Sequence, residues 1–203
     1  VVVSASIDCW LRPWCEKNGL ELLATKLEIK DGKVTGKLKS LNCFGAEKVN
    51  RIKESYDLEK YDYIYFAAGF HPENLEGAQL SPLEKIREFA SHDKCVAIGE
   101  IGLDYYWMES SKEEQKKFFK AQIELAKKLD MPIIVHDRDA HGDTLDILRE
   151  TKPKGVVHCF SGSKEMAREI IKLGMYIGLN GVVTFNNARK SLEVAKEIPI
   201  ERL

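Results

Sequence analysis

The sequence lacks an apolar run long enough to span a membrane and an excess of charge of either sign. No stretch approaches the roughly 20 apolar residues that a membrane helix needs, and no signal peptide is visible. The 31 basic and 32 acidic residues give a net charge of −1, which excludes a generally basic surface for nucleic acid. We therefore expect a cytoplasmic protein that does not associate with membranes.

Cysteine is also sparse. The five cysteines are odd in number and scattered, without a C-x-x-C pair, which disfavours a disulfide framework or a zinc ribbon. In contrast, 44% of the 203 residues are hydrophobic and 31% are charged, which is enough for a folded core and excludes intrinsic disorder.

After about residue 63, short apolar strands alternate with amphipathic helices. Apolar strands of this kind are typical of parallel sheets buried on both faces, and their alternation with helices predicts right-handed βαβ units. We expect an α/β fold with a parallel β-sheet of about six strands, two short of an eight-stranded barrel. The predicted strands are 1–6, 63–69, 95–100, 133–136, 156–160 and 176–179, and the helices between the later strands are 82–92, 112–129, 144–151, 164–173 and 189–198.

Before residue 63 the pattern is less regular. Asp31-Gly32 lies between two strand-like runs, 25–29 and 34–38, and predicts one β-hairpin. Helices are predicted over 10–23 and 46–55. No proline- or glycine-rich linker marks the change, so residues 1–203 are expected to form a single α/β unit, with 1–62 and 63–203 as its two fragments.

Four successive strand ends carry metal-ligating residue types: His71, Glu100, His136 and His158. Because the carboxyl ends of parallel strands meet at one edge of a sheet, we expect these side chains to lie close together. Imidazole and carboxylate bind zinc, manganese or magnesium. Any one strand-end histidine is more often structural, but their coincidence favours a metal site.

Other polar and aromatic residues keep two interpretations. Asp104 either caps a turn or contacts substrate, and Arg138 either pairs with the neighbouring aspartates or binds phosphate. We expect Trp10, Trp14 and Trp107 to be packing residues and not platforms on which nucleobases stack.

Five motifs from residue 68 onwards occur in a distinctive order, and with them residues 63–203 resemble the TatD-type metal-dependent deoxyribonucleases. The resemblance implies a TIM-barrel fold and a binuclear metal site, with Glu100, His136 and His158 as metal ligands. It also implies that His71 lies beside the site. The candidate substrate-binding residues are His71, Asp104 and Arg138. The motifs are Ala68-Gly69-Phe70-His71-Pro72, 98–105, Ile134-Val135-His136-Asp137-Arg138, 157–162 and Gly178-Leu179-Asn180-Gly181.

The family pattern is incomplete in this sequence. The His-x-His pair of the first strand is absent, and the sequence stops at Leu203, before the strand that carries a Glu-Thr-Asp motif. Residues 1–62 resemble instead the later half of a HAD-superfamily phosphatase core of the phosphoserine-phosphatase-like branch, through 1–6, 31–36 and 47–49. In that comparison Ser4 and Lys48 are vestigial catalytic residues, because the nucleophilic D-x-D strand is missing.

Together the two resemblances predict an engineered chimeric scaffold, a partial TIM barrel fused to a HAD/Rossmann-like fragment, without efficient native catalysis. The alternative is a reduced divalent-metal-dependent hydrolase, a TatD-like phosphodiesterase using Glu100, His136 and His158. The expected metal is zinc, manganese or magnesium, bound weakly or not at all, and DNA or a phosphate ester is the expected weak ligand. A nucleic-acid-binding module without chemistry is disfavoured by the neutral charge balance.

An incomplete barrel would leave the last strand, 176–179, with an uncovered edge that invites pairing. We expect this edge to be covered in one of three ways: by residues 1–6, by the hairpin within 25–38, or by a second copy of the chain in a homodimer formed edge to edge.

Overall fold

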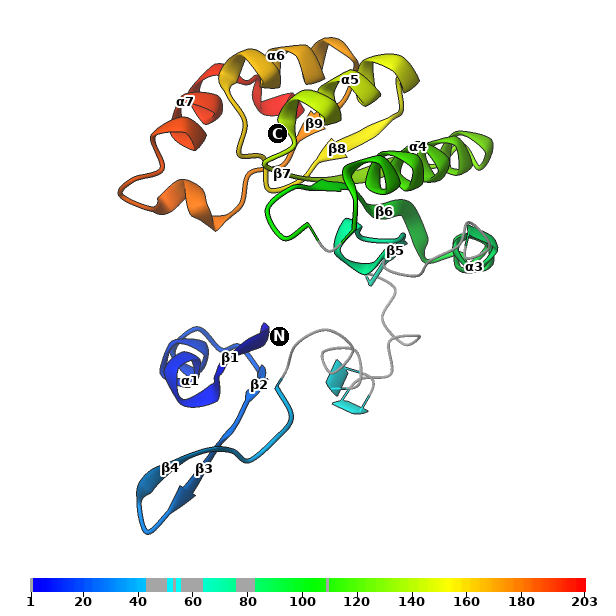
Figure 1. Cartoon of the computed structure of the whole chain (residues 1–203). Helices are drawn as coiled ribbons and strands as arrows, with labels where there is room; N and C mark the ends of the chain where they lie inside the picture. Colours follow the sequence, from blue (N-terminus) through cyan, green and yellow to red (C-terminus); the bar gives the residue numbers. More distant parts are fainter. Residues whose placement is uncertain (1, 43–50, 53, 56–63, 76–82, 109) are drawn as a thin grey trace. The chain divides into compact units, whose positions relative to one another are not determined.

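The computed structural model describes residues 2–42, 51–52, 54–55, 64–75, 83–108 and 110–203 (Figure 1). The chain divides into two compact units, Val1–Ile64 and Tyr65–Leu203. The division falls beside residue 63, where the sequence pattern becomes regular. That residues 1–203 form a single α/β unit stays a prediction.

In the first unit, two strands pair in parallel across a helix. Strand β1 (Val2–Ile7) is followed by helix α1 (Asp8–Lys17) and then by β2 (Leu22–Thr25), which pairs with β1. The helix predicted over 10–23 was therefore too long. It ends early because Gly19 adopts φ 65°, a left-handed conformation that favours glycine at a helix terminus, and the apolar residues after it form β2.

The predicted hairpin is confirmed. Strands β3 (Leu27–Lys30) and β4 (Lys33–Leu38) pair in antiparallel fashion. Asp31 (φ 50°) and Gly32 (φ 73°) both have positive φ, as a two-residue type I′ turn requires. Of the helix predicted over 46–55, residues 51–52 and 54–55 are helical, and the other positions lie outside the described residues.

The second unit contains a five-stranded parallel sheet in the order β5-β6-β7-β8-β9. The predicted α/β class with a parallel sheet is confirmed. Among the residues that the structure describes, this sheet has five strands and not the expected six or so, and β1 pairs with β2 in a separate two-stranded sheet. The strands are β5 (Phe66–Ala68), β6 (Cys95–Asp104), β7 (Ile133–Arg138), β8 (Gly155–Val157) and β9 (Tyr176–Ile177).

Helices alternate with these strands, and α4, α5 and α6 lie on the same side of the curved sheet (Figure 1). None of the helices in the described part of the chain is long and apolar enough to cross a membrane. The helices are α3 (Leu83–Ala90), α4 (Lys112–Lys128), α5 (His141–Thr151), α6 (Lys164–Lys172) and α7 (Arg189–Glu197), and the short 3-10 turns are η2 (Pro72–Asn74), η3 (Gly181–Thr184) and η4 (Ile200–Arg202).

The core of this unit lies between sheet and helices. Ile98 and Ile101 of β6 and Phe119 and Ile123 of α4 are completely buried, and each such side chain contributes about 1.5–3 kcal/mol relative to exposure. Helix α4 begins at the N-cap Ser111, whose hydroxyl accepts a hydrogen bond from the backbone N–H of Glu114. The apolar face of α4 packs against the sheet, and the carboxyl ends of the strands of this sheet form the candidate site.

Candidate metal centre

A β-bulge in β6 presents Glu100 to the site. The pairing of β6 with β7 joins Gly99 to Ile134 and Ile101 to Val135, and Glu100 lies unpaired between these registers. An unpaired residue of this kind bends its strand and re-aims its side chain. The Glu100 carboxylate is thus available to groups at the carboxyl ends of the neighbouring strands.

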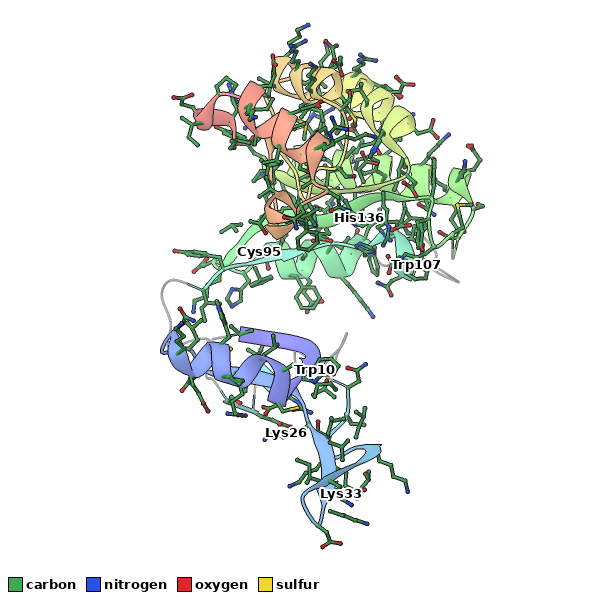
Figure 2. All side chains as sticks on the ribbon, turned by 90° about the vertical axis from the view of Figure 1, so that its left-hand side faces the viewer. Trp10, Lys26, Lys33, Cys95, Trp107 and His136 are labelled. Atoms are coloured by element: carbon green, nitrogen blue, oxygen red, sulfur yellow. The ribbon has the colours of Figure 1, made fainter. Side chains whose placement is uncertain are left out.

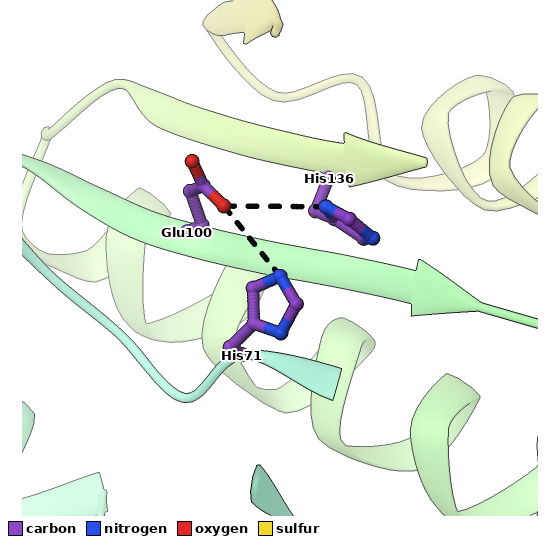
Figure 3. Close-up of side chains that lie close together, drawn as sticks. All are labelled: His71, Glu100 and His136. Carbon is purple, nitrogen blue, oxygen red and sulfur yellow. Dashed lines mark ion pairs between the residues drawn. The ribbon is translucent and has the colours of Figure 1, made fainter. Parts of the chain in front are cut away.

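Three imidazoles surround this carboxylate. His158 Nε2 lies 2.9 Å from Glu100 Oε1, whereas His71 Nε2 and His136 Nδ1 lie 3.5 Å and 4.0 Å from Oε2. Figure 3 shows His71 and His136 directed at the same carboxylate oxygen. The four side chains expected to meet at the strand ends do lie together.

Hydrogen bonds decide which ring nitrogen His71 and His136 each turn toward Glu100, and whether that nitrogen carries the proton. His71 Nδ1 accepts a bond from the backbone N–H of Glu73 at 3.3 Å, so in the neutral ring the proton is on Nε2, facing Glu100. Burial lowers the pKa of His71, and repulsion from His136 adds to this effect, which favours the neutral ring. His136 Nε2 instead lies 2.9 Å from Asp104 Oδ2. An ionised carboxylate only accepts hydrogen bonds, so His136 presents the Nδ1 lone pair to Glu100.

Asp104 is enclosed at the end of β6, with 1% of its surface exposed. Burial by itself would raise the pKa of its carboxyl group. Hydrogen bonds from the Trp107 and Tyr106 backbone N–H groups (3.0 and 2.9 Å) and from His136 outweigh burial and lower it. All these partners favour an ionised carboxylate, and the geometry favours Asp104 as the group that orients His136.

Two glutamines of α4, which the sequence analysis did not assign to the site, hold the loops on either side of it. The Gln122 amide bonds to both backbone groups of Phe70, next to His71. Gln115 bonds in the same way to the N–H and carbonyl groups of Asp104. Both glutamines are 1% exposed. Their polarity on an otherwise apolar helix face was the available sequence signal.

The sequence analysis also missed Glu73, one of whose carboxylate oxygens lies within 4.8 Å of ligand atoms of Asp104 and His136. His71, Glu100 and His136 form another group within the same limit. A carboxylate with several imidazoles suits zinc or manganese, so the donor set fits a divalent ion.

The other residues singled out in the sequence are Arg138, Lys48, Ser4 and the three tryptophans. Arg138 ends β7 and is exposed; its guanidinium lies 4.0 Å from the centroid of the Tyr106 ring. Lys48 lies outside the described residues, and Ser4 belongs to β1 in the first unit. The expectation that the tryptophans pack is wrong: Trp10, Trp14 and Trp107 are 72%, 57% and 55% exposed.

Comparison with known sequences matches residues 17–203 to the family described as TatD related DNase. The chain belongs to the TatD family. One relative, the uncharacterized metal-dependent hydrolase YabD of Bacillus subtilis, is 48% identical over 172 residues, covering 78% of this chain and 68% of that protein. YcfH of Escherichia coli K12, another uncharacterized metal-dependent hydrolase, is 42% identical over 145 residues, covering 70% of this chain and 54% of its own.

A solved TatD structure agrees. YJJV, a TatD homologue from Escherichia coli K12, superposes with a TM-score of 0.67 at 34% identity, over 78% of this chain and 62% of that one. The chain thus spans between about half and two thirds of the length of these three relatives.

These matches correct the chimera hypothesis. One family covers residues 17–203, including most of the fragment assigned to a HAD-like core, so neither a HAD fusion nor an engineered, inactive scaffold is supported. The HAD resemblance misled because a β-α-β start, a hairpin and a lysine-bearing helix are common to many α/β folds. The expectation of weak or absent metal binding depended on the chimera and also lacks support. The alternative, a metal-dependent hydrolase, fits better.

Proposed function

We propose that this chain is a divalent-metal-dependent phosphodiesterase that hydrolyses DNA, with the ion held by Glu100, His136 and His158. The observation that carries the proposal is the Glu100 carboxylate, with His158 Nε2 at 2.9 Å and His136 Nδ1 at 4.0 Å. A TatD-family relative from Escherichia fergusonii, 36% identical over 156 residues, is named a 3'-5' ssDNA/RNA exonuclease, which supports a nucleic-acid substrate.

When bound, a divalent ion lowers the pKa of water and stabilises negative charge on a phosphoryl oxygen. The chain's own contribution is orientation. Asp104 holds the proton of His136 on Nε2 and leaves Nδ1 free to bind, as a carboxylate partner does for metal-ligating histidines in general. The buried amide of Gln115 in turn fixes the backbone of Asp104.

Two further residues, His71 and Arg138, are assigned to bind the substrate. His71 carries its proton on Nε2, toward Glu100, and we assign it as a hydrogen-bond donor to a phosphate oxygen. Arg138 is exposed and forms no ion pair with any residue that the structure describes, so its charge is available to a phosphate group. Pairing of two chains through a sheet edge stays a prediction.

The test is cleavage of labelled single- and double-stranded DNA by chelator-treated protein to which manganese, magnesium or zinc is returned. We expect activity that depends on the ion and falls to background in Glu100→Gln and His158→Ala. Glu113→Gln is the matched control, because Glu113 on α4 has a side chain that is 87% exposed. Metal-independent cleavage, or full activity in Glu100→Gln, would overturn the proposal.

A further inference from the structure

Beside the metal centre, two aromatic side chains stand exposed next to an arginine. Tyr106 and Trp107 are each 55% exposed, and their rings meet edge to face with centroids 4.9 Å apart. The Arg138 guanidinium lies 4.0 Å from the Tyr106 centroid and 5.6 Å from that of Trp107. Figure 2 shows Trp107 at the edge of its unit. An exposed cluster of large aromatic rings, unlike a single exposed ring, is a candidate binding surface.

The cluster is attached to the metal centre by backbone hydrogen bonds. Asp104 Oδ1 accepts the N–H groups of Tyr106 and Trp107, while Oδ2 of the same carboxylate holds His136. The Tyr105 N–H donates to the Arg138 carbonyl oxygen at 2.8 Å, which ties the loop to the end of β7. One buried carboxylate therefore fixes the aromatic loop relative to the proposed ligand His136.

We propose that Tyr106, Trp107 and Arg138 form a stacking platform for an unpaired nucleobase of a single-stranded substrate whose phosphodiester lies at Glu100. This inference rests on the proposed function and names the substrate form. An aromatic face next to a guanidinium binds any base by stacking and cation–π attraction. The positive charge of Arg138 complements the negatively charged strand. In a duplex the base faces are already covered by their neighbours, so the platform selects single strands.

The test measures binding in metal-free protein, so that cleavage does not interfere. In a Trp10→Phe/Trp14→Phe background, Trp107 reports alone, and we expect its fluorescence to be quenched by oligodeoxyadenylate. Trp107→Ala, made in the wild-type background and followed by anisotropy of a labelled strand, should weaken binding by about 5- to 140-fold, the range for loss of one stacked base. Trp107→Phe retains a ring and should restore most of the affinity.

Two comparisons separate stacking from general charge. An oligonucleotide with abasic sites should bind wild type and Trp107→Ala equally, and Phe89→Ala, which removes another exposed aromatic ring (57%), should leave binding unchanged. Equal affinity of wild type and Trp107→Ala for the base-containing strand would overturn the platform, even if metal-dependent cleavage is observed. Conversely, loss of binding in Trp107→Ala without any metal-dependent cleavage would retain the platform and refute the proposed reaction.

Discussion

His136 Nε2 lies 2.9 Å from a carboxylate oxygen of Asp104, a residue that is almost completely buried. This contact decides which imidazole nitrogen of His136 faces Glu100. Asp104, which was a candidate substrate-binding residue, is 1% exposed, and its contacts favour a role exerted through His136.

Replacement of Asp104 by asparagine tests this role. In Asp104→Asn the side-chain amide would donate to His136 Nε2 and so move the ring proton to Nδ1, toward Glu100. We expect metal affinity to fall by about 10- to 100-fold, the usual effect of losing such a supporting partner. Calorimetric titration with manganese or zinc measures it. Asp146→Asn, at a side chain that is 75% exposed, is the control and should bind like wild type; equal affinities in all three proteins would contradict the assignment.

Gly102 allows β7 to approach β6 at His136. A Cβ atom at this position would lie 1.9 Å from the His136 carbonyl oxygen, and φ is 149°. We expect Gly102→Ala to destabilise the protein by about 3 kcal/mol, because only backbone could move aside. Gly142, in α5, has no atom within 4 Å of such a Cβ, so Gly142→Ala should be neutral or stabilising by up to about 1 kcal/mol. Urea denaturation compares them, and similar stabilities would refute the steric argument.

Gln122 tests the support of the loop that carries His71. In Gln122→Leu both backbone groups of Phe70 lose their partner, and we expect a loss of about 1–3 kcal/mol in unfolding free energy. Nucleic-acid binding should also weaken, because His71 is no longer held. Lys117→Leu changes an exposed position on the same helix and should leave thermal stability within about 0.5 kcal/mol of wild type. A Gln122→Leu protein as stable as this control would show that the loop does not need the amide.

His141 gives stability a dependence on pH. Its hydrogen bond to Asp137 (2.7 Å) raises its pKa against the effect of burial; Asp139 raises it further and Lys190 opposes. Because the folded-state pKa lies above the unfolded value of about 6.5, the stabilisation is complete below pH 6.5 and is lost as the pH rises through the folded-state pKa. Wild type should therefore exceed His141→Gln in stability most at about pH 5.5–6.

Thermal unfolding of wild type and His141→Gln from acid to alkaline pH measures this difference in stability. Asp137→Asn removes the main cause of the raised pKa of His141. In that background the difference in stability caused by His141→Gln should therefore become nearly independent of pH. A difference that stays constant from acid to alkaline pH would contradict the assignment.

Much of the second unit could be predicted from the sequence, for a physical reason. Its strands are short apolar runs and its helices have a continuous apolar face, so local patterning and the tertiary fold agree. The first unit was harder. Leu22–Thr25 continues a helical periodicity from Trp10, and only the left-handed Gly19 and the pairing with β1 make it a strand.

For the candidate site, the sequence indicated which side chains would meet but not how each is protonated. His71 and His136 look equivalent at two strand ends, yet the Glu73 N–H and the Asp104 carboxylate orient them differently: His71 turns its protonated Nε2 toward Glu100, and His136 turns its unprotonated Nδ1 toward it. The exposure of Trp107 was not predictable either. Trp107 lies in a turn directly after β6, where the backbone N–H groups of Tyr106 and Trp107 donate to Asp104.

Gln115 and Gln122 are seven residues apart on α4, two helical turns or about 10.5 Å. Helix α4 thus fixes the distance between the backbone of Phe70, next to His71, and the backbone of Asp104 at the end of β6. Substitutions on its exposed face leave this spacing intact, whereas inserting or deleting one residue between the glutamines would rotate one of them by about 100° away from its loop. The length of this segment of α4, more than the identity of its surface residues, is what the geometry of the candidate metal centre constrains.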